Sequence, residues 1–255
     1  MIEITSRKNK TVLDALALHE KKTRDREGRF FIEGAKLFGE ALSSGRMPLR
    51  VFVTEKYLAL HPEVEELDTE VIRVTDEVYA KITDESSPEG VFAIFEKKNT
   101  KPVTEISAVL ILEGIQDPGN VGTLLRSAVA FGVREIITVD CADIYSPKTV
   151  RASMGAIFKI PCTAFSDIET AVDYARGIVD IVVATALHTD SVSIAEVNTA
   201  TSAIMIGSEG RGLSEKALAL ADKKVIIPIE NIESLNASVA GAICMYDAML
   251  KRKKL

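Results

Sequence analysis

The stretch AVLILEGIQDPGNVGTLLRSAVAFG, residues 108–132, indicates the fold class of this 255-residue chain. Its first eight residues form a nearly continuous apolar run, which is typical of a strand covered on both faces in a parallel sheet. Pro118 and Gly119 then predict a turn, and Asn120 stands where the cap of a following helix is expected. A strand, a loop and a helix in this order predict an α/β fold.

Arg126 stands in the middle of that predicted helix, among apolar residues. The residues three and four positions away are mostly small: Gly122, Thr123, Val129 and Ala130. The large apolar residues fall mostly on a separate stripe, so the helix can bury that stripe and leave the arginine above small side chains. The alternative interpretation is an ordinary solvated arginine on an amphipathic helix.

The composition is that of a globular protein, with 47% hydrophobic and 27% charged residues. No apolar run approaches the ~18 residues that span a bilayer, and the N-terminal MIEITSRKNK lacks the apolar core of a signal peptide. We therefore expect a cytoplasmic protein with no membrane partner. The three cysteines are widely spaced and odd in number, and the three histidines lack ligand spacing, so no disulfide framework and no metal site is expected.

The polar, proline-containing segment 97–106 is predicted to link a first domain, 1–96, to a second domain, 107–255. In the first domain, helices are expected near 8–22, 34–44 and 75–82, and strands at RFFIE, LRVFV, VIRV and VFAIF. In the second domain, helices are expected at the opening stretch, near 168–177 and near 236–250. Its strands are AVLILEGI, EIITV, IVDIVVATA, SAIMIG and KKVIIPI, whose Val/Ile runs indicate a mostly parallel sheet.

Basic residues concentrate at the start of a chain whose net charge is −6. Residues 1–50 hold 11 Lys and Arg against 7 Asp and Glu. This excess is either a solvated surface or a surface that contacts phosphates. The residues expected to contact RNA from this region are Arg7, Lys8, Lys10, Lys21, Lys22 and Arg24.

Two further loops follow predicted strands, where ligands bind in open parallel sheets. GSEGRGLS, 207–214, spaces its glycines as GxxGxG, which matches neither the dinucleotide fingerprint nor a phosphate loop. Its glycines permit a close backbone approach, although a plain connector is the alternative. In IPIENIESLNASVAGAICMYDAML, 227–250, Ser234, Asn236 and Ser238 stand at a helix start, whose free N–H groups bind polar ligands or are simply capped by these side chains.

Taken together, the three loops resemble the three motifs of the SpoU/TrmH group of the SPOUT RNA methyltransferases. The matching residues are Asn120, Gly122 and Arg126; Gly207, Glu209 and Gly212; and Ile227, Pro228, Ser234, Leu235, Asn236, Ser238, Val239 and Ala240. Ser208 and Ala237 are mild departures from the family pattern. YSPKTVRASMGAIFKIP, 145–161, resembles the family's middle segment, and its Arg151 is expected to contact RNA. The first domain resembles a ribosomal-protein-like substrate-binding domain.

The resemblance implies a small N-terminal ribosomal-protein-like α/β domain and a C-terminal parallel-sheet domain with a deep trefoil knot. It implies a homodimer that transfers a methyl group from S-adenosylmethionine to a ribose 2′-hydroxyl of structured RNA. We expect ribosomal RNA as the substrate, with transfer RNA as the alternative. A catalytically inactive RNA-binding protein, or a small-molecule-binding α/β protein of another family, stays open. The apolar last helix, 237–250, is the expected dimer interface.

The family motifs also assign roles to single residues. Those implied for the cofactor are Thr185, Leu187, Gly207, Ile227, Leu235 and Ser238, and those implied for catalysis are Arg126, Asn120, Glu209, Ser234 and Asn236. A guanidinium titrates at roughly 12.5–13.8 and does not readily accept a proton at neutral pH. We therefore expect Arg126 to bind phosphate and to stabilise the developing alkoxide, rather than to act as the general base.

Overall fold

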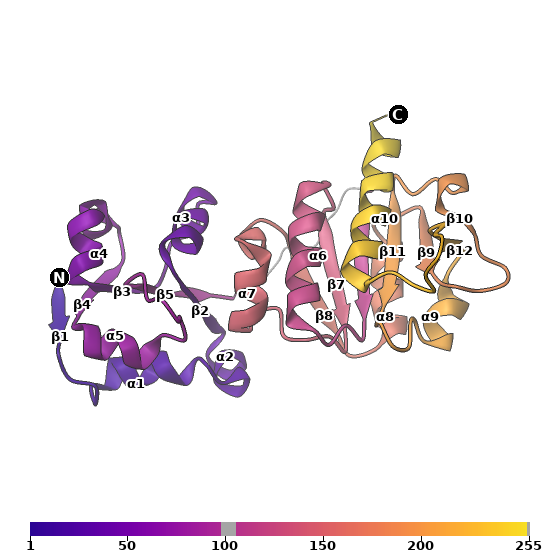
Figure 1. Ribbon diagram of the computed structural model, residues 1–255. Coiled ribbons are helices and arrows are strands. Elements are labelled where there is room, and N and C mark those ends of the chain that lie inside the picture. The colour runs from indigo at the N-terminus through magenta and orange to yellow at the C-terminus, as the bar shows by residue number, and fades with distance from the viewer. Residues whose placement is uncertain (98–105, 254–255) are drawn as a thin grey trace. The chain divides into compact units, whose positions relative to one another are not determined.

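The computed structural model describes residues 1–97 and 106–253 and divides into two compact units. One unit contains residues 1–97 together with 145–158, and the other contains residues 106–144 and 159–253 (Figure 1). The segment 145–158 therefore belongs to the first unit by packing, although it lies within the second half of the sequence. The expected linker, 97–106, lies outside the described residues except for its first and last positions.

A mixed five-stranded sheet forms the first unit, which confirms the expected small α/β domain. The strand order is β1 (Ile2–Ile4), β4 (Glu70–Val74), β3 (Arg50–Thr54), β5 (Val91–Glu96), β2 (Arg29–Glu33). β5 runs antiparallel to both of its neighbours, whereas β1, β4 and β3 are parallel. The helices are α1 (Lys10–Ala17), α2 (Lys21–Glu27), α3 (Ala35–Ser43), α4 (Glu55–Leu60), α5 (Asp76–Ile82) and α7 (Pro147–Ser153), with short 3₁₀ turns at Pro62–Glu66 and Ala156–Phe158.

The single helix expected near 8–22 is wrong, because the chain breaks there into α1 and α2. Arg24, in α2, reaches back to the break. Its Nη1 donates to the carbonyl oxygens of Leu18, at 2.8 Å, and His19, at 2.6 Å. These carbonyls lie where a continuous helix would have bonded them internally. Arg24 is only 3% exposed, so its expected place on an RNA-binding surface is also wrong.

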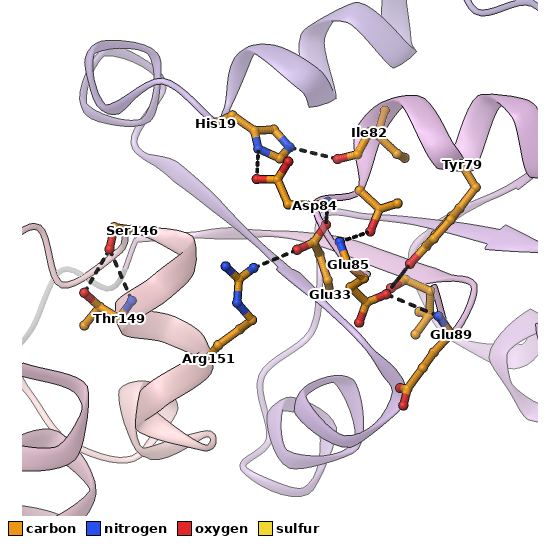
Figure 2. A network of polar contacts seen from close by, with 12 residues as sticks. His19, Glu33, Tyr79, Ile82, Asp84, Glu85, Glu89, Ser146, Thr149 and Arg151 are labelled. Carbon is orange, nitrogen blue, oxygen red and sulfur yellow. Dashed lines mark hydrogen bonds and ion pairs between the residues drawn. The ribbon is translucent and has the colours of Figure 1, made fainter. Parts of the chain in front are cut away.

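Residues 145–158 are tied to the first unit by one buried carboxylate and by aromatic packing. Glu33, at the end of β2, accepts hydrogen bonds from the Asp84 backbone N–H at 2.7 Å and from Arg151 Nη1 at 3.1 Å (Figure 2). Phe158 packs on Phe30, with ring centroids 6.0 Å apart. A buried carboxylate is costly unless it is paired and hydrogen-bonded, so Arg151 contributes to the stability of this unit.

The second unit contains a seven-stranded sheet whose described pairs are all parallel, as the Val/Ile runs predicted. The strand order is β10 (Val192–Ser193), β12 (Lys223–Ile226), β9 (Ile181–Thr185), β11 (Ser202–Gly207), β6 (Val109–Glu113), β7 (Glu135–Val139), β8 (Cys162–Phe165). The helices are α6 (Pro118–Ala130), α8 (Ile168–Arg176), α9 (Glu215–Leu220) and α10 (Ala237–Arg252), with a 3₁₀ turn at Ile194–Glu196. None of the helices in the described ranges is long and apolar enough to cross a membrane.

Helices cover both faces of this sheet (Figure 1). On one face Val109 and Ile111 of β6 share a core with residues of α8 and α9. On the other face α10 packs closely against α6, because a Cβ atom added to Gly241 would lie 2.4 Å from Leu124 Cδ2. The missing side chain at Gly241 thus permits the close approach of α6, which contains the first motif, and α10, at whose start the third motif ends.

Candidate cofactor and active site

A cavity of about 470 Å³ lies at the carboxyl ends of the adjacent strands β9, β11 and β12. This is the edge at which open parallel sheets bind ligands, and the volume is within the ~300–1,000 Å³ that small-molecule sites occupy. Its lining comes from the ends of the three strands and the residues that follow them, from α9 and from the start of α10. The lining includes Thr185, Ala186, Leu187, His188, Ile206, Gly207, Ser208, Glu209, Arg211, Gly212, Leu213, Ile226, Ile227, Ser234, Leu235, Ala237 and Ala240.

Five of the six residues predicted to contact a cofactor line this cavity: Thr185, Leu187, Gly207, Ile227 and Leu235. Leu187 is 66% exposed, which is high for a leucine and is explained by its position on an open cavity. The sixth residue, Ser238, is buried and does not line the cavity. Its hydroxyl instead donates to Asn236 Oδ1 at 2.6 Å, within the cap of α10.

Gly207 lies under the loop that closes one side of the cavity. A Cβ atom added there would lie 2.1 Å from the carbonyl carbon of Gly212 and 2.2 Å from the nitrogen of Leu213. The loop turns back onto the strand end through a hydrogen bond from the Gly212 N–H to the Ser208 carbonyl oxygen, at 2.8 Å. The glycine requirement at position 207 therefore comes from backbone that occupies the space of a side chain.

Asn120 is not the helix cap that the sequence predicted. α6 begins at Pro118, and Asp117 is its N-cap, with Oδ1 accepting from the Asn120 N–H at 2.9 Å. Proline suits the first position of a helix, so the cap moves to the residue before it. The side chain of Asn120, in the first turn, is thereby left to make other contacts.

Three polar side chains form a chain of hydrogen bonds that joins all three motif loops. Asn236 Oδ1 accepts from the N–H groups of Ser238 and Val239, which leaves its amide nitrogen to donate to Asn120 Oδ1 at 3.2 Å. Asn120 Nδ2 in turn donates to Glu209 Oε1. Each amide has one orientation that satisfies this pattern, because Glu209 as a carboxylate only accepts. Four of the predicted catalytic residues, these three and Ser234 on the cavity wall, therefore lie at one site.

Arg126, the fifth predicted catalytic residue, lies on α6 six residues after Asn120. It is exposed, and its guanidinium makes no hydrogen bond or ion pair with the residues that the structure describes. Thr123 and Ala130, three and four residues from it, are exposed, whereas Val121, Leu124 and Ala128 are buried, so α6 packs through the other side of the helix. Arg126 does not line the cavity, but it is available to an external anion.

The residues predicted to contact RNA differ in exposure. Arg7, Lys8, Lys10, Lys21 and Lys22 are exposed, and Lys21 pairs with Asp25 at 2.7 Å. Such pairs between exposed side chains are weak and leave the lysine accessible. The side chain of Arg151 is 46% exposed despite its ion pair with Glu33. Only Arg24 is removed from this group by burial.

Sequence reasoning missed several polar residues at the site, among them Glu113, His188 and Arg211. His188 and Arg211 line the cavity, and Glu113 is the last residue of β6. Each directly follows or ends a strand, or belongs to a loop that does, so the rule that ligands bind at strand ends could have found them. The motif pattern did not include them.

The cysteines take no part in this site. Burial raises the pKa of the Cys141 thiol to about 11 and that of Cys244 to about 12, so both are protonated at neutral pH. Among the described residues, no group of three His, Cys, Asp or Glu could hold a metal ion.

Comparisons with known proteins match both units. The model of the SpoU rRNA Methylase family matches residues 107–246, and that of the MRM3-like substrate binding domain matches residues 9–93. The chain is 30% identical over 248 residues to the 23S rRNA (guanosine(2553)-2'-O)-methyltransferase RlmP of Bacillus subtilis, with 96% of this chain and 98% of that protein covered. It is 28% identical over 265 residues to the 23S rRNA (uridine(2479)-2'-O)-methyltransferase of Streptomyces viridochromogenes, covering 98% and 92%.

A similar solved structure is that of an rRNA methyltransferase from Sinorhizobium meliloti with bound AdoMet. It has a TM-score of 0.85 and 31% identity, with 99% of this chain and 98% of that chain covered. The resemblance seen in the three motif loops is thus confirmed across both units. This protein belongs to the SpoU rRNA methylase family.

Proposed function

We propose that this protein transfers a methyl group from S-adenosylmethionine to a ribose 2′-hydroxyl of ribosomal RNA. The observation that carries the proposal is the hydrogen-bond chain from Asn236 through Asn120 to Glu209, which lines a cavity of cofactor size. Relatives that are similar over nearly the whole chain carry names of ribose 2′-O-methyltransferases that act on 23S rRNA. A catalytically inactive RNA-binding protein would have no need of this arrangement.

The cavity suits S-adenosylmethionine in size and in chemistry. The cofactor supplies a methyl group activated by its sulfonium. Leu187, Ile227 and Leu235 provide an apolar wall, and the backbone around Gly207 can approach the ligand closely. Glu209 provides a negative charge near the mouth, which favours a cationic ligand. These residues bind and orient the cofactor, while the hydrogen-bond chain fixes Glu209 relative to α6.

Arg126 is the residue that we propose to act on the RNA. Its unpaired guanidinium is available for bidentate contact with a phosphate and for stabilising the alkoxide that develops at the 2′-oxygen. Asn120, Asn236 and Glu209 hold the geometry by hydrogen bonds, and we expect Ser234, on the cavity wall, to hydrogen-bond the bound substrate. Alignment of the hydroxyl with the methyl carbon contributes much of the rate, since orientation can be worth ~7–11 kcal/mol.

The first unit is proposed to bind the RNA, with a boundary at the linker 97–106. Its match to a substrate binding domain and its exposed basic residues Arg7, Lys8, Lys10, Lys21 and Lys22 support this division. We also propose that the partly exposed Arg151 extends the same surface. Family membership further supports the deep trefoil knot, and the free cysteines among the described residues support a reducing location such as the cytoplasm.

A homodimer through α10 is proposed from an apolar stripe on that helix. Val239, Ile243, Tyr246 and Leu250 are 47%, 37%, 47% and 39% exposed. Their spacing of four, three and four residues places them on one face of the helix. A contiguous apolar face of this kind is typical of an interface between copies of a chain, where it is removed from water.

Gly207→Ala is expected to lower the affinity for S-adenosylmethionine at least ~30-fold, about 2 kcal/mol, because the new methyl group displaces the backbone of the loop. Isothermal titration measures the affinity. Gly210→Ala, on the same loop, has nothing within 4 Å of the added Cβ and should bind within about twofold of the unmutated protein, a negligible free-energy change. Equal binding by both variants would show that the cofactor does not use this cavity.

Arg126→Ala is expected to lower methyl transfer at least ~100-fold, the scale of losing one preorganised stabiliser, without a change in folding or cofactor affinity. Arg126→Lys should recover little, since an ammonium does not reproduce the guanidinium fork. Arg134→Ala, another exposed arginine of this unit, is the control. Single-turnover assays measure the rate, and resistance of one nucleotide to alkaline cleavage identifies the 2′-O-methyl product. Full turnover by Arg126→Ala, or methylation of a base, would contradict the assignment.

Replacement of Arg7, Lys8 and Lys10 together by alanine is expected to weaken RNA binding and to flatten its salt dependence. Each lost phosphate contact removes about 0.7–0.9 from the slope of log K against log salt concentration. Filter binding between low and moderate salt measures this slope. The control is the replacement of Lys36 and Lys56 together by alanine. Both are exposed lysines outside residues 7–10, and the slope should stay that of the unmutated protein. An unchanged slope in the triple variant would place the RNA elsewhere.

The unmutated chain is expected to be a dimer by light scattering at micromolar concentration. Ile243→Glu should give a monomer, because a carboxylate buried in an apolar interface is costly. Leu60→Glu, at a leucine that is 70% exposed on α4, should stay dimeric. A monomeric unmutated chain, or a dimeric Ile243→Glu variant, would contradict this interface.

A further inference from the structure

We propose that Glu113 is a positioning residue, which fastens the loop 208–214 over the cavity and so keeps Glu209 in place. This inference rests on the proposed function of the cavity. Glu113 is the last residue of β6, and in the pairing of β6 with β11 it lies opposite Gly207, the residue from which the loop departs. It belongs to none of the three motifs.

The carboxylate of Glu113 holds the far end of the loop by two hydrogen bonds. The Ser214 N–H donates to Oε2 at 2.8 Å, and the Ser214 hydroxyl donates to Oε1 at 2.7 Å. Hydrogen bonds to a charged acceptor are stronger than neutral ones, and a two-point contact also fixes direction. Among the described residues, Ser214 is the hydrogen-bond partner of the Glu113 carboxylate.

The near end of the loop lies beside the same strand end. A Cβ atom added to Gly114 would lie 3.8 Å from the Ser208 Cβ, so Ser208 lies near the residue that follows Glu113. Within the loop, the Gly212 N–H donates to the Ser208 carbonyl oxygen at 2.8 Å. Both ends of the loop are therefore held at the end of β6, one by the strand pairing at Gly207 and one by the carboxylate.

The first turn of α6, which follows β6 in the chain, holds the middle of the loop. Glu209 accepts from Asn120 Nδ2, and Asn120 follows Glu113 by seven residues. Gly207 leaves room for the loop, but it supplies no attractive contact of its own side chain. Glu113 and Asn120 are thus the two side chains that bind the glycine-rich loop to the first motif. With the Glu113 contact removed, Asn120 and the buried side chain of Leu213 still hold the loop, but Ser214 is released and Glu209 is held less firmly.

Glu113→Ala is expected to raise the Kd for S-adenosylmethionine by about 10- to 100-fold, the scale of lost charge-assisted hydrogen bonds. The turnover number should fall as well, while the KM for RNA is unchanged. Glu113→Gln keeps an acceptor for the Ser214 N–H and a donor for its hydroxyl oxygen, so it should recover most of the affinity. Asp167→Ala removes a comparable carboxylate, the N-cap of α8. It should leave the Kd for S-adenosylmethionine and the turnover number unchanged.

Hydrogen exchange of the cofactor-free protein separates loop fixing from general stability. In Glu113→Ala the peptide that covers 207–214 should exchange faster, while peptides from α8 and β7 keep the protection of the unmutated protein. Glu113→Ala and Ser214→Ala should also be partly non-additive in the Kd, since both remove the hydrogen bond from the Ser214 hydroxyl to Glu113, although Ser214→Ala keeps the backbone N–H donor and also loses the cap of α9. Unchanged exchange of 207–214, or additive effects of the two variants, would overturn the role of Glu113. Failure of the unmutated protein to bind S-adenosylmethionine would instead overturn the proposed function.

Discussion

The site depends on one constraint: the backbone of Gly212 and Leu213 occupies the space in which a side chain of residue 207 would lie. Because the loop turns back there, Glu209 faces the start of α6 and can accept from Asn120. Asn120 in turn accepts from Asn236, whose other amide atom caps α10. A contact between two stretches of backbone thus determines the positions of three polar side chains from distant parts of the sequence.

Much of the architecture was predictable because it depends on local patterns. The long Val/Ile runs predicted the strands of the parallel sheet, and RFFIE matches β2 residue for residue. β8 at Cys162–Phe165 was missed because CTAF lacks the Val/Ile or aromatic run that marked the predicted strands, and α9 at Glu215–Leu220 was missed because six residues are too few to show a helical period. The break between α1 and α2 was missed because its cause is a side chain, Arg24, that bonds the carbonyls across it.

The site was predictable in its members but not in its connections. The motifs brought Asn120, Glu209 and Asn236 together as a set, yet their order along the hydrogen-bond chain follows from helix caps that only the structure reveals. Asp117 takes the cap expected of Asn120, and Ser238 turns inward to Asn236 instead of toward the cavity. Counting charges also overestimated the basic surface, because some basic side chains are buried. Arg24, for example, donates to backbone carbonyl oxygens inside the first unit. Lys251 shows the same use in α10, where it donates to the carbonyls of Ile194 and Val197.

The position of residues 145–158 in the first unit has a consequence for the order in which the chain folds. A ribosome delivers β1 to β5 early, but the packing partners α7 and Phe158 emerge only after β6, α6 and β7 of the second unit have been made. Until then Glu33 has no Arg151, and Phe30 and Phe95 lack the ring that packs on them. Domains that are contiguous in sequence can fold one after another during synthesis. Here the N-terminal unit is completed only when more than half of the chain has been translated, after the first two strands of the second unit have been made.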